Sequence, residues 1–139
     1  MIRIVENSLA GQSPSNHSPS LEVKEIFAKN GILQTSLDLE HRPQQENMAQ
    51  RVSESLHAHD SLLFEAGTGV GKSLAYLVPG LIFALTAKRP FIVATHTISL
   101  QEQILKKDLP LCRLLFDQVD HLRKYLDFRA TLLAGKANY

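Results

Sequence analysis

The sequence predicts an α/β fold in which a parallel sheet is flanked by helices, and three observations lead to this prediction. Short apolar runs, typical of buried strands, alternate with longer segments of helical periodicity. A glycine-rich loop joins the first of these runs to a long apolar helix. The composition is that of a globular chain, because 44% of the 139 residues are hydrophobic and 21% are charged. We therefore expect a packed core.

The N-terminal region, residues 1–20, is expected to be a disordered tail. Residues 12–20 include none of the hydrophobic residue types, so they cannot offset the entropy lost on ordering. Ordered structure is expected from Leu21, where apolar residues at helical spacing predict a helix over 21–29. The first residues lack the apolar core of a signal peptide, so we expect a cytoplasmic protein.

The remaining elements alternate along the chain. Three short apolar runs are expected to form strands, at residues 61–66, 91–95 and 129–134. Helices are expected from Pro43 to about residue 57, over 72–87, over 99–107 with an interruption at Pro110, and around 119–126. The longest apolar stretch is broken by Pro79-Gly80 and is shorter than the ~20 residues of a membrane span, so no membrane partner is expected.

The loop at residues 66–73 reads Ala-Gly-Thr-Gly-Val-Gly-Lys-Ser, which is the Walker A pattern with alanine in the first position. Its glycines are expected to adopt positive φ angles that turn successive N–H groups toward a phosphate. Lys72 is expected to reach the β- and γ-phosphates, and the Ser73 hydroxyl to bind Mg²⁺, which makes these two the candidate catalytic residues. The expected nucleotide-binding residues of this segment are Ala66, Gly67, Thr68, Gly69, Val70, Gly71, Lys72, Ser73 and Leu74.

A P-loop does not by itself define a reaction, because kinases, GTPases, transporters and helicases all use one. Three segments narrow the choice: residues 41–48, residues 65–79 and residues 93–104. In this order and spacing they resemble the start of the DinG/XPD-type superfamily 2 iron–sulfur DNA helicases, closest to the bacterial DinG and YoaA branch. The resemblance covers about residues 21–139 and implies the N-terminal part of a RecA-like first motor domain.

The resemblance also implies roles for individual residues. Gln45 matches the glutamine of the Q motif, which reads adenine, and an amide can both donate and accept as the adenine edge requires. Arg42 would lie beside it and contribute to the same site. Thr95, His96 and Thr97 match motif Ia, which contacts the backbone of single-stranded DNA. The alternatives are an exposed helix residue for Gln45 and an ordinary polar strand end for residues 95–97.

The function that the resemblance implies is ATP-dependent 5′-to-3′ unwinding of DNA, in DNA repair, by a monomeric parent protein that uses ATP and Mg²⁺. In the resemblance, residues 135–139 match the segment that precedes a four-cysteine 4Fe–4S cluster. The single cysteine of this sequence, Cys112, is expected to lie in the core and not to bind a cluster. We therefore expect an N-terminal fragment, truncated before the iron–sulfur domain and inactive alone. The alternatives are a stand-alone P-loop nucleotide-binding module and a small nucleotide kinase.

Overall fold

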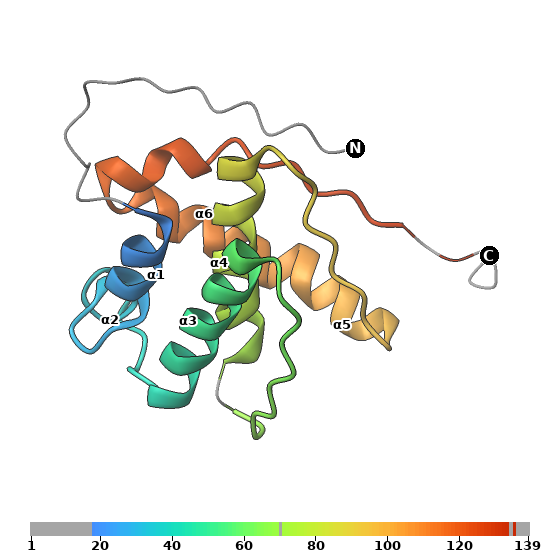
Figure 1. Cartoon of the computed structure of the whole chain (residues 1–139), viewed down its shortest axis with the longest axis horizontal. Helices are drawn as coiled ribbons and strands as arrows, with labels where there is room; N and C mark the ends of the chain where they lie inside the picture. Colours follow the sequence, from blue (N-terminus) through green and yellow to red (C-terminus); the bar gives the residue numbers. More distant parts are fainter. Residues whose placement is uncertain (1–17, 70, 134, 136–139) are drawn as a thin grey trace.

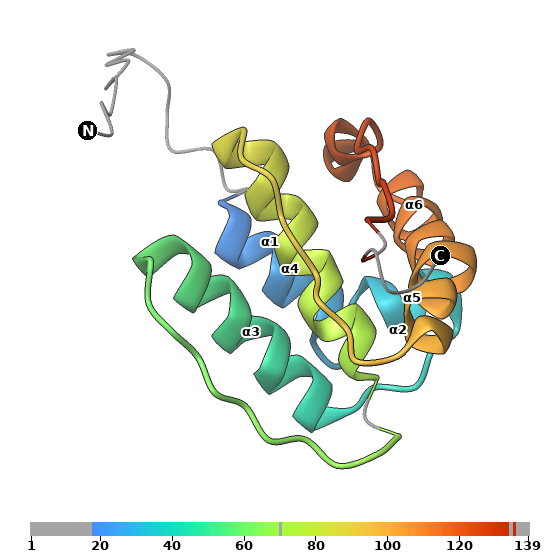
Figure 2. The same ribbon diagram turned by 90° about the vertical axis from the view of Figure 1, so that its right-hand side faces the viewer.

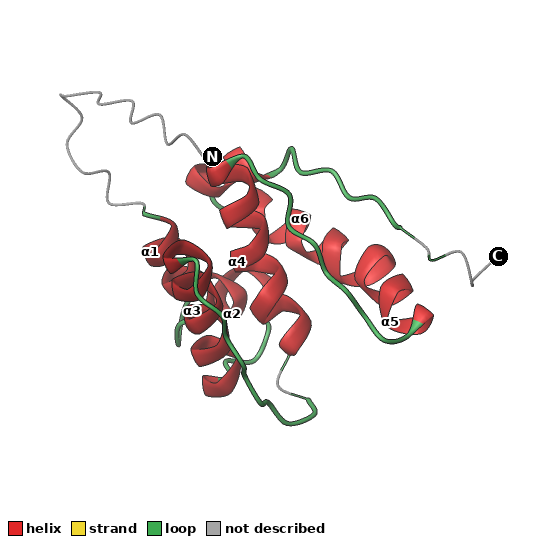
Figure 3. Ribbon diagram, turned by 45° about the vertical axis from the view of Figure 1, so that its right-hand side comes forward, coloured by secondary structure: helices red, strands yellow, loops and turns green. Residues whose placement is uncertain are grey.

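The computed structural model describes residues 18–69, 71–133 and 135. The regular elements of this part of the chain are all helical, as Figures 1 and 3 show. In chain order they are α1 (Pro19–Phe27), α2 (Ile32–Leu37), α3 (Pro43–Ala58), α4 (Lys72–Ala87), α5 (Ile98–Gln103), the π-helix η1 (Ile104–Asp108), α6 (Leu109–Asp117) and the 3₁₀-helix η2 (Asp120–Tyr125).

Helix α4 forms the centre of the molecule. It is predominantly apolar, and its buried residues run along most of its length, from Leu74 to Ile82. Figure 2 shows α3 on one side of α4 and α5 with α6 on the other, while α1 packs against both α3 and α4. The predicted helix over 72–87 and the predicted start at Pro43 are both confirmed. This packing fixes the N-terminus of α4 beside the N-terminus of α3.

The N-terminal boundary differs from the prediction. Helix α1 begins at Pro19, because the Ser18 hydroxyl accepts a hydrogen bond from the Leu21 amide at 3.4 Å and caps the helix. Residues 18–20 are therefore structured, while the rest of the expected tail lies outside the described residues. Helix α2, a single short helix that the sequence pattern did not predict, buries Ile32 and Leu33 in the core.

The predicted interruption at Pro110 is wrong. Proline lacks an N–H and normally breaks a helix interior, but here it lies in the first turn of α6. The preceding π-helix η1 provides a wide turn, in which the Leu109 amide bonds the Ile104 carbonyl, five residues earlier. The chain therefore continues from α5 through η1 into α6 without a break.

Within the described ranges, the three predicted strands are extended segments without strand pairing. Segment 91–95 shows the alternation of a strand, because Phe91, Val93 and Thr95 are half-buried whereas Ile92 is 79% exposed. Segments 61–66 and 91–95 run toward the same end of the molecule in Figures 1 and 2. A hollow of about 570 Å³ borders Leu62 and residues 91–96, and neither of these two described segments forms a paired strand.

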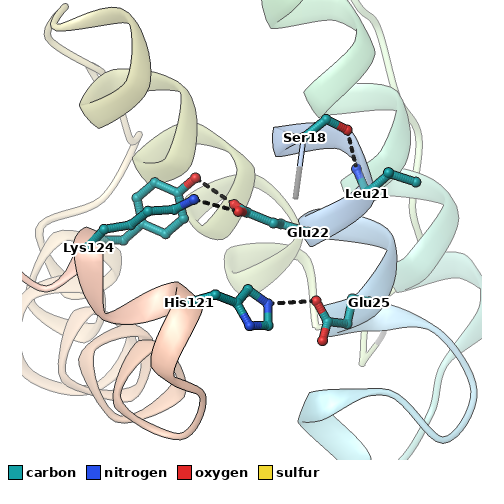
Figure 4. A network of polar contacts seen from close by, with 7 residues as sticks. Ser18, Leu21, Glu22, Glu25, His121 and Lys124 are labelled. Atoms are coloured by element: carbon teal, nitrogen blue, oxygen red, sulfur yellow. Dashed lines mark hydrogen bonds and ion pairs between the residues drawn. The ribbon is translucent and has the colours of Figure 1, made fainter. Parts of the chain in front are cut away.

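A buried carboxylate links α1 to η2 (Figure 4). Glu22 is fully buried, and its two oxygens accept hydrogen bonds from Lys124 Nζ at 2.7 Å and from Tyr125 Oη at 2.5 Å. Burial, together with this hydrogen bond to Glu22, raises the pKa of Tyr125 above its ordinary value. One turn further along α1, Glu25 pairs with His121 Nε2 at 2.9 Å.

Candidate nucleotide-binding site

The P-loop connects the extended segment 61–66 to the N-terminus of α4. Two of its described glycines have positive φ angles, 79° at Gly69 and 75° at Gly71, which explains why glycine is required there. The expectation of a positive φ at Gly67 is wrong, since Gly67 is not among the residues with that geometry. Val70 lies outside the described residues.

The N-terminus of α4 presents free backbone donors beside this loop. The Ala75 amide bonds the Gly71 carbonyl at 3.3 Å and begins the helical ladder. The amides of Lys72, Ser73 and Leu74 precede that bond, so they have no acceptor within the helix and can bind an anion at the positive end of the helix dipole. The Leu74 side chain is buried in the core, so this predicted residue can contribute only its backbone.

The Lys72 side chain folds back over the loop. Its Nζ donates a hydrogen bond to the Ala66 carbonyl at 3.2 Å, which holds the ammonium group beside the loop backbone. A Cβ added at Gly67 or Gly69 would meet nothing within 4 Å, so this side of the loop faces open space. The residues present therefore fit a triphosphate, with backbone donors, an ammonium group and room for the ligand.

Two side chains from the start of α3 contact the same loop. Arg42 Nη1 donates to the Gly69 carbonyl at 2.6 Å, and Gln45 Nε2 donates to the Gly71 carbonyl at 3.1 Å. Pro43 begins α3, which places Arg42 and Gln45 about one turn apart on one side of the helix. Gln45 is only 7% exposed, so the alternative of an exposed helix residue is wrong. Side chains and loop carbonyls that are separated by 26 or 27 positions in the sequence thus form one site.

Residues 95–97 form the turn before α5. Thr95 Oγ1 donates to the Thr97 carbonyl at 3.1 Å, and Thr97 Oγ1 accepts a hydrogen bond from the Leu100 amide at 3.2 Å as the N-cap of α5. The Thr97 hydroxyl proton is not used by that cap, and the side chain of His96 is exposed. In Figures 1 and 2 this turn lies at the end of α4 that carries the P-loop.

The described residues do not fit the expected four-cysteine 4Fe–4S cluster, which requires four thiolate ligands. The sequence contains one cysteine, Cys112, and its side chain is fully buried in the core, as predicted. Burial and, to a smaller extent, Asp108 raise the pKa of the Cys112 thiol to about 12, so the thiol stays protonated. No group of three or more metal-binding side chains occurs in the part of the chain that the structure describes.

The hollow beside segment 91–96, which Tyr76 and Asp60 also line, was not predicted from the sequence. No signal in the sequence indicates the hollow, because residues 91–94 are apolar at every position and their exposure is set by the tertiary packing. None of the described helices is long and apolar enough to cross a membrane.

The glycine-rich loop leads into α4, and the Lys72 side chain folds back onto it. Arg42 and Gln45, from the start of the neighbouring helix, donate hydrogen bonds to its carbonyls. This arrangement is that of a P-loop nucleotide-binding domain. Residues 38–120 match the family model described as "Type III restriction enzyme, res subunit", and the chain belongs to this family, whose fold is that of P-loop helicases. No solved structure matches the chain significantly.

The resemblance to DinG-type helicases is confirmed by comparison with curated proteins. The chain is 40% identical over 126 residues to the ATP-dependent helicase DinG of Mycobacterium tuberculosis (strain ATCC 25177 / H37Ra), covering 89% of this chain and 18% of that protein. It is 35% identical over 121 residues to the ATP-dependent DNA helicase YoaA of Haemophilus influenzae, covering 85% and 17%. It is 32% identical over 124 residues to a protein of Bacillus subtilis (strain 168) named 3'-5' exonuclease DinG, covering 89% and 12%. The chain thus spans less than a fifth of the length of these relatives.

Proposed function

We propose that this chain is the ATP-binding part of the first motor domain of an ATP-dependent DNA helicase. The observation that supports this most directly is the contact of Arg42 and Gln45 with the P-loop, because it brings the amide that matches the Q motif against a phosphate-binding loop. Two of the compared relatives are named ATP-dependent helicases. On this proposal the whole protein couples ATP hydrolysis to 5′-to-3′ unwinding.

Within the proposed site, each group has a defined task. The amides at the start of α4 and the Lys72 ammonium bind the phosphate oxygens, and the Ser73 hydroxyl holds the Mg²⁺ that accompanies the nucleotide. Bound Mg²⁺ would neutralise charge that develops on the phosphates during hydrolysis. The iron–sulfur cluster of the parent helicase is part of the same proposal, and its ligands are not supplied by these residues, which include a single buried cysteine.

We further propose that segments 61–66, 91–95 and 129–133 belong to a RecA-like parallel sheet that further strands of the same protein complete. Their exposed apolar side chains support this, because Leu63 is 99%, Ile92 79% and Leu133 83% exposed. Parallel sheets are normally covered on both faces, so such residues are suited to burial under additional elements. The hollow beside segment 91–96 provides space for backbone pairing.

Single-stranded DNA is the proposed polymer ligand, with Thr95, His96 and Thr97 on its sugar–phosphate backbone. The free hydroxyl proton of Thr97 and the exposed imidazole of His96 are suitable donors to phosphate oxygens. The Thr95 hydroxyl already donates within the turn, so on this proposal it orders the turn.

The test is titration of a fluorescent ATP analogue with Mg²⁺ into the wild-type chain, Lys72→Ala and Lys106→Ala. Removing the ammonium group from the loop is expected to weaken binding about 100-fold, the loss typical of a charge-assisted contact to phosphate. Lys106 is a matched control, because it is exposed and, among the described residues, pairs with Glu102 at 3.8 Å on the helical surface. Equal affinity of Lys72→Ala and wild type would refute the assignment of the P-loop.

A second candidate function is 3'-5' exonuclease activity, because the Bacillus subtilis relative is named a 3'-5' exonuclease. Incubation with 3′-labelled single-stranded DNA and Mg²⁺, without ATP, distinguishes the two. We expect the label to stay on full-length DNA. Release of the 3′ nucleotide by wild type and by Lys72→Ala alike would favour the exonuclease instead.

A further inference from the structure

The guanidinium of Arg42 contacts the loop backbone at one specific carbonyl. Its Nη1 lies 2.6 Å from the Gly69 carbonyl oxygen, at a loop position whose φ of 79° few residues other than glycine adopt. The Arg42 side chain is 43% exposed, and its Nε lies 3.8 Å from Glu40 Oε2. Its strongest contact is thus with the phosphate-binding loop, across 27 positions of sequence.

Gln45 holds the neighbouring part of the loop in the same way. Its amide donates to the Gly71 carbonyl, and a trans peptide is planar, so the orientation of this carbonyl also sets the direction of the Lys72 N–H. A Cβ built on Gly71 would overlap the Gln45 amide and approach Arg42 Nη1 to 3.7 Å. The α3 side chains therefore lie directly against the loop and leave no room for a side chain at position 71.

We propose that Arg42 is a positioning residue that holds the P-loop in its phosphate-binding shape, and that it does not read the base. This inference rests on the proposed nucleotide site. A guanidinium that grips a loop carbonyl improves the binding of any ligand that uses the loop amides, whatever base that ligand carries. Substitution of Arg42 is therefore expected to lower the affinity for every triphosphate by the same factor, including a triphosphate without a nucleoside.

The experiment measures binding of ATP, GTP and inorganic tripolyphosphate, each with Mg²⁺, by competition against a fluorescent nucleotide. The variants are Arg42→Ala, Arg42→Lys and the control Arg51→Ala, together with thermal unfolding of each without ligand. Arg51 is a suitable control because it lies on the same helix, is 61% exposed and pairs with Glu54 at 3.7 Å.

For Arg42→Ala we expect a loss of about tenfold for all three ligands, the size of one charge-assisted hydrogen bond. Arg42→Lys is expected to lose less, since an ammonium group can donate to the same carbonyl but without the planar fork. Arg51→Ala is expected to match wild type for every ligand, and the unliganded melting temperatures of all variants to agree.

A loss of affinity confined to ATP would overturn the inference, because it would place Arg42 on the adenine base. Unchanged binding of all three ligands would also overturn it. If Arg42→Ala melts earlier without ligand, Arg42→Lys decides: an intermediate, equal loss supports positioning, and a base-selective or absent loss overturns it. Failure of the proposed function looks different, because then the wild-type chain binds none of the three ligands.

Discussion

Replacement of Lys124 by methionine is expected to destabilise the chain, because it leaves the Glu22 carboxylate buried without its counter-charge. The two groups are 2.7 Å apart, and the side chains are 50% and 0% exposed, respectively. At this distance the Coulomb attraction is about 6 kcal/mol for an effective dielectric constant of 20 and about 1.5 kcal/mol for that of water. Because Lys124 is half exposed, solvent screens the pair, and we expect a loss of about 3 kcal/mol.

The assay is urea unfolding followed by far-UV circular dichroism, with a double-mutant cycle of Lys124→Met and Glu22→Gln. The double variant removes both charges and keeps an amide that can accept a hydrogen bond from Tyr125 Oη, so it is expected to be more stable than Lys124→Met alone. Lys106→Met is the control, because the pair of Lys106 with Glu102 is exposed and longer, at 3.8 Å, and its loss should cost about 0.5 kcal/mol or less.

The interaction would be refuted as a stabilising element by two results. One is a cost for Lys124→Met no larger than that for the Lys106→Met control. The other is strict additivity, in which the double variant loses the sum of the two single losses, since additivity means that the two side chains do not interact energetically.

Three further predictions concern other parts of the structure. Because burial raises the pKa of the Cys112 thiol from 9.0 to about 12, the unfolded chain loses this proton first, so the free energy of unfolding should fall above pH 9, by at most about 1.4 kcal/mol per pH unit. Urea unfolding at pH 8, 9 and 10 checks this, and the same slope in Cys112→Ala would contradict it. Ser53 Oγ is buried without a hydrogen-bond partner among the described residues, so Ser53→Ala should stabilise the chain by about 1 kcal/mol, seen as a higher urea midpoint; a lower midpoint would indicate a hidden partner. Gly71→Ala should weaken ATP binding more than tenfold, because alanine is strained at a φ of 75° and its Cβ overlaps the Gln45 amide; wild-type affinity in the same titration would disprove this.

The local features of the site were predictable from sequence because their causes lie within a few residues. Pro43 fixes the start of α3, and the glycine-rich loop followed by an apolar run fixes the start of α4 at Lys72. The interruption predicted at Pro110 does not occur, because the chain accommodates the proline through a preceding π-helical turn that no short-range pattern indicates.

Sequence alone thus determined the P-loop, its lysine and serine, the two long helices and the resemblance to helicases, all of which depend on short-range spacing. The tertiary structure decided which groups meet on the loop, since Arg42 and Gln45 reach it across 27 and 26 positions through the packing of α3 on α4. It also decided that segments 61–66 and 91–95 are unpaired within the described residues. Apolar alternation sets the conformation of a strand, but pairing requires a partner backbone at hydrogen-bonding distance, and only the tertiary arrangement determines whether one is there.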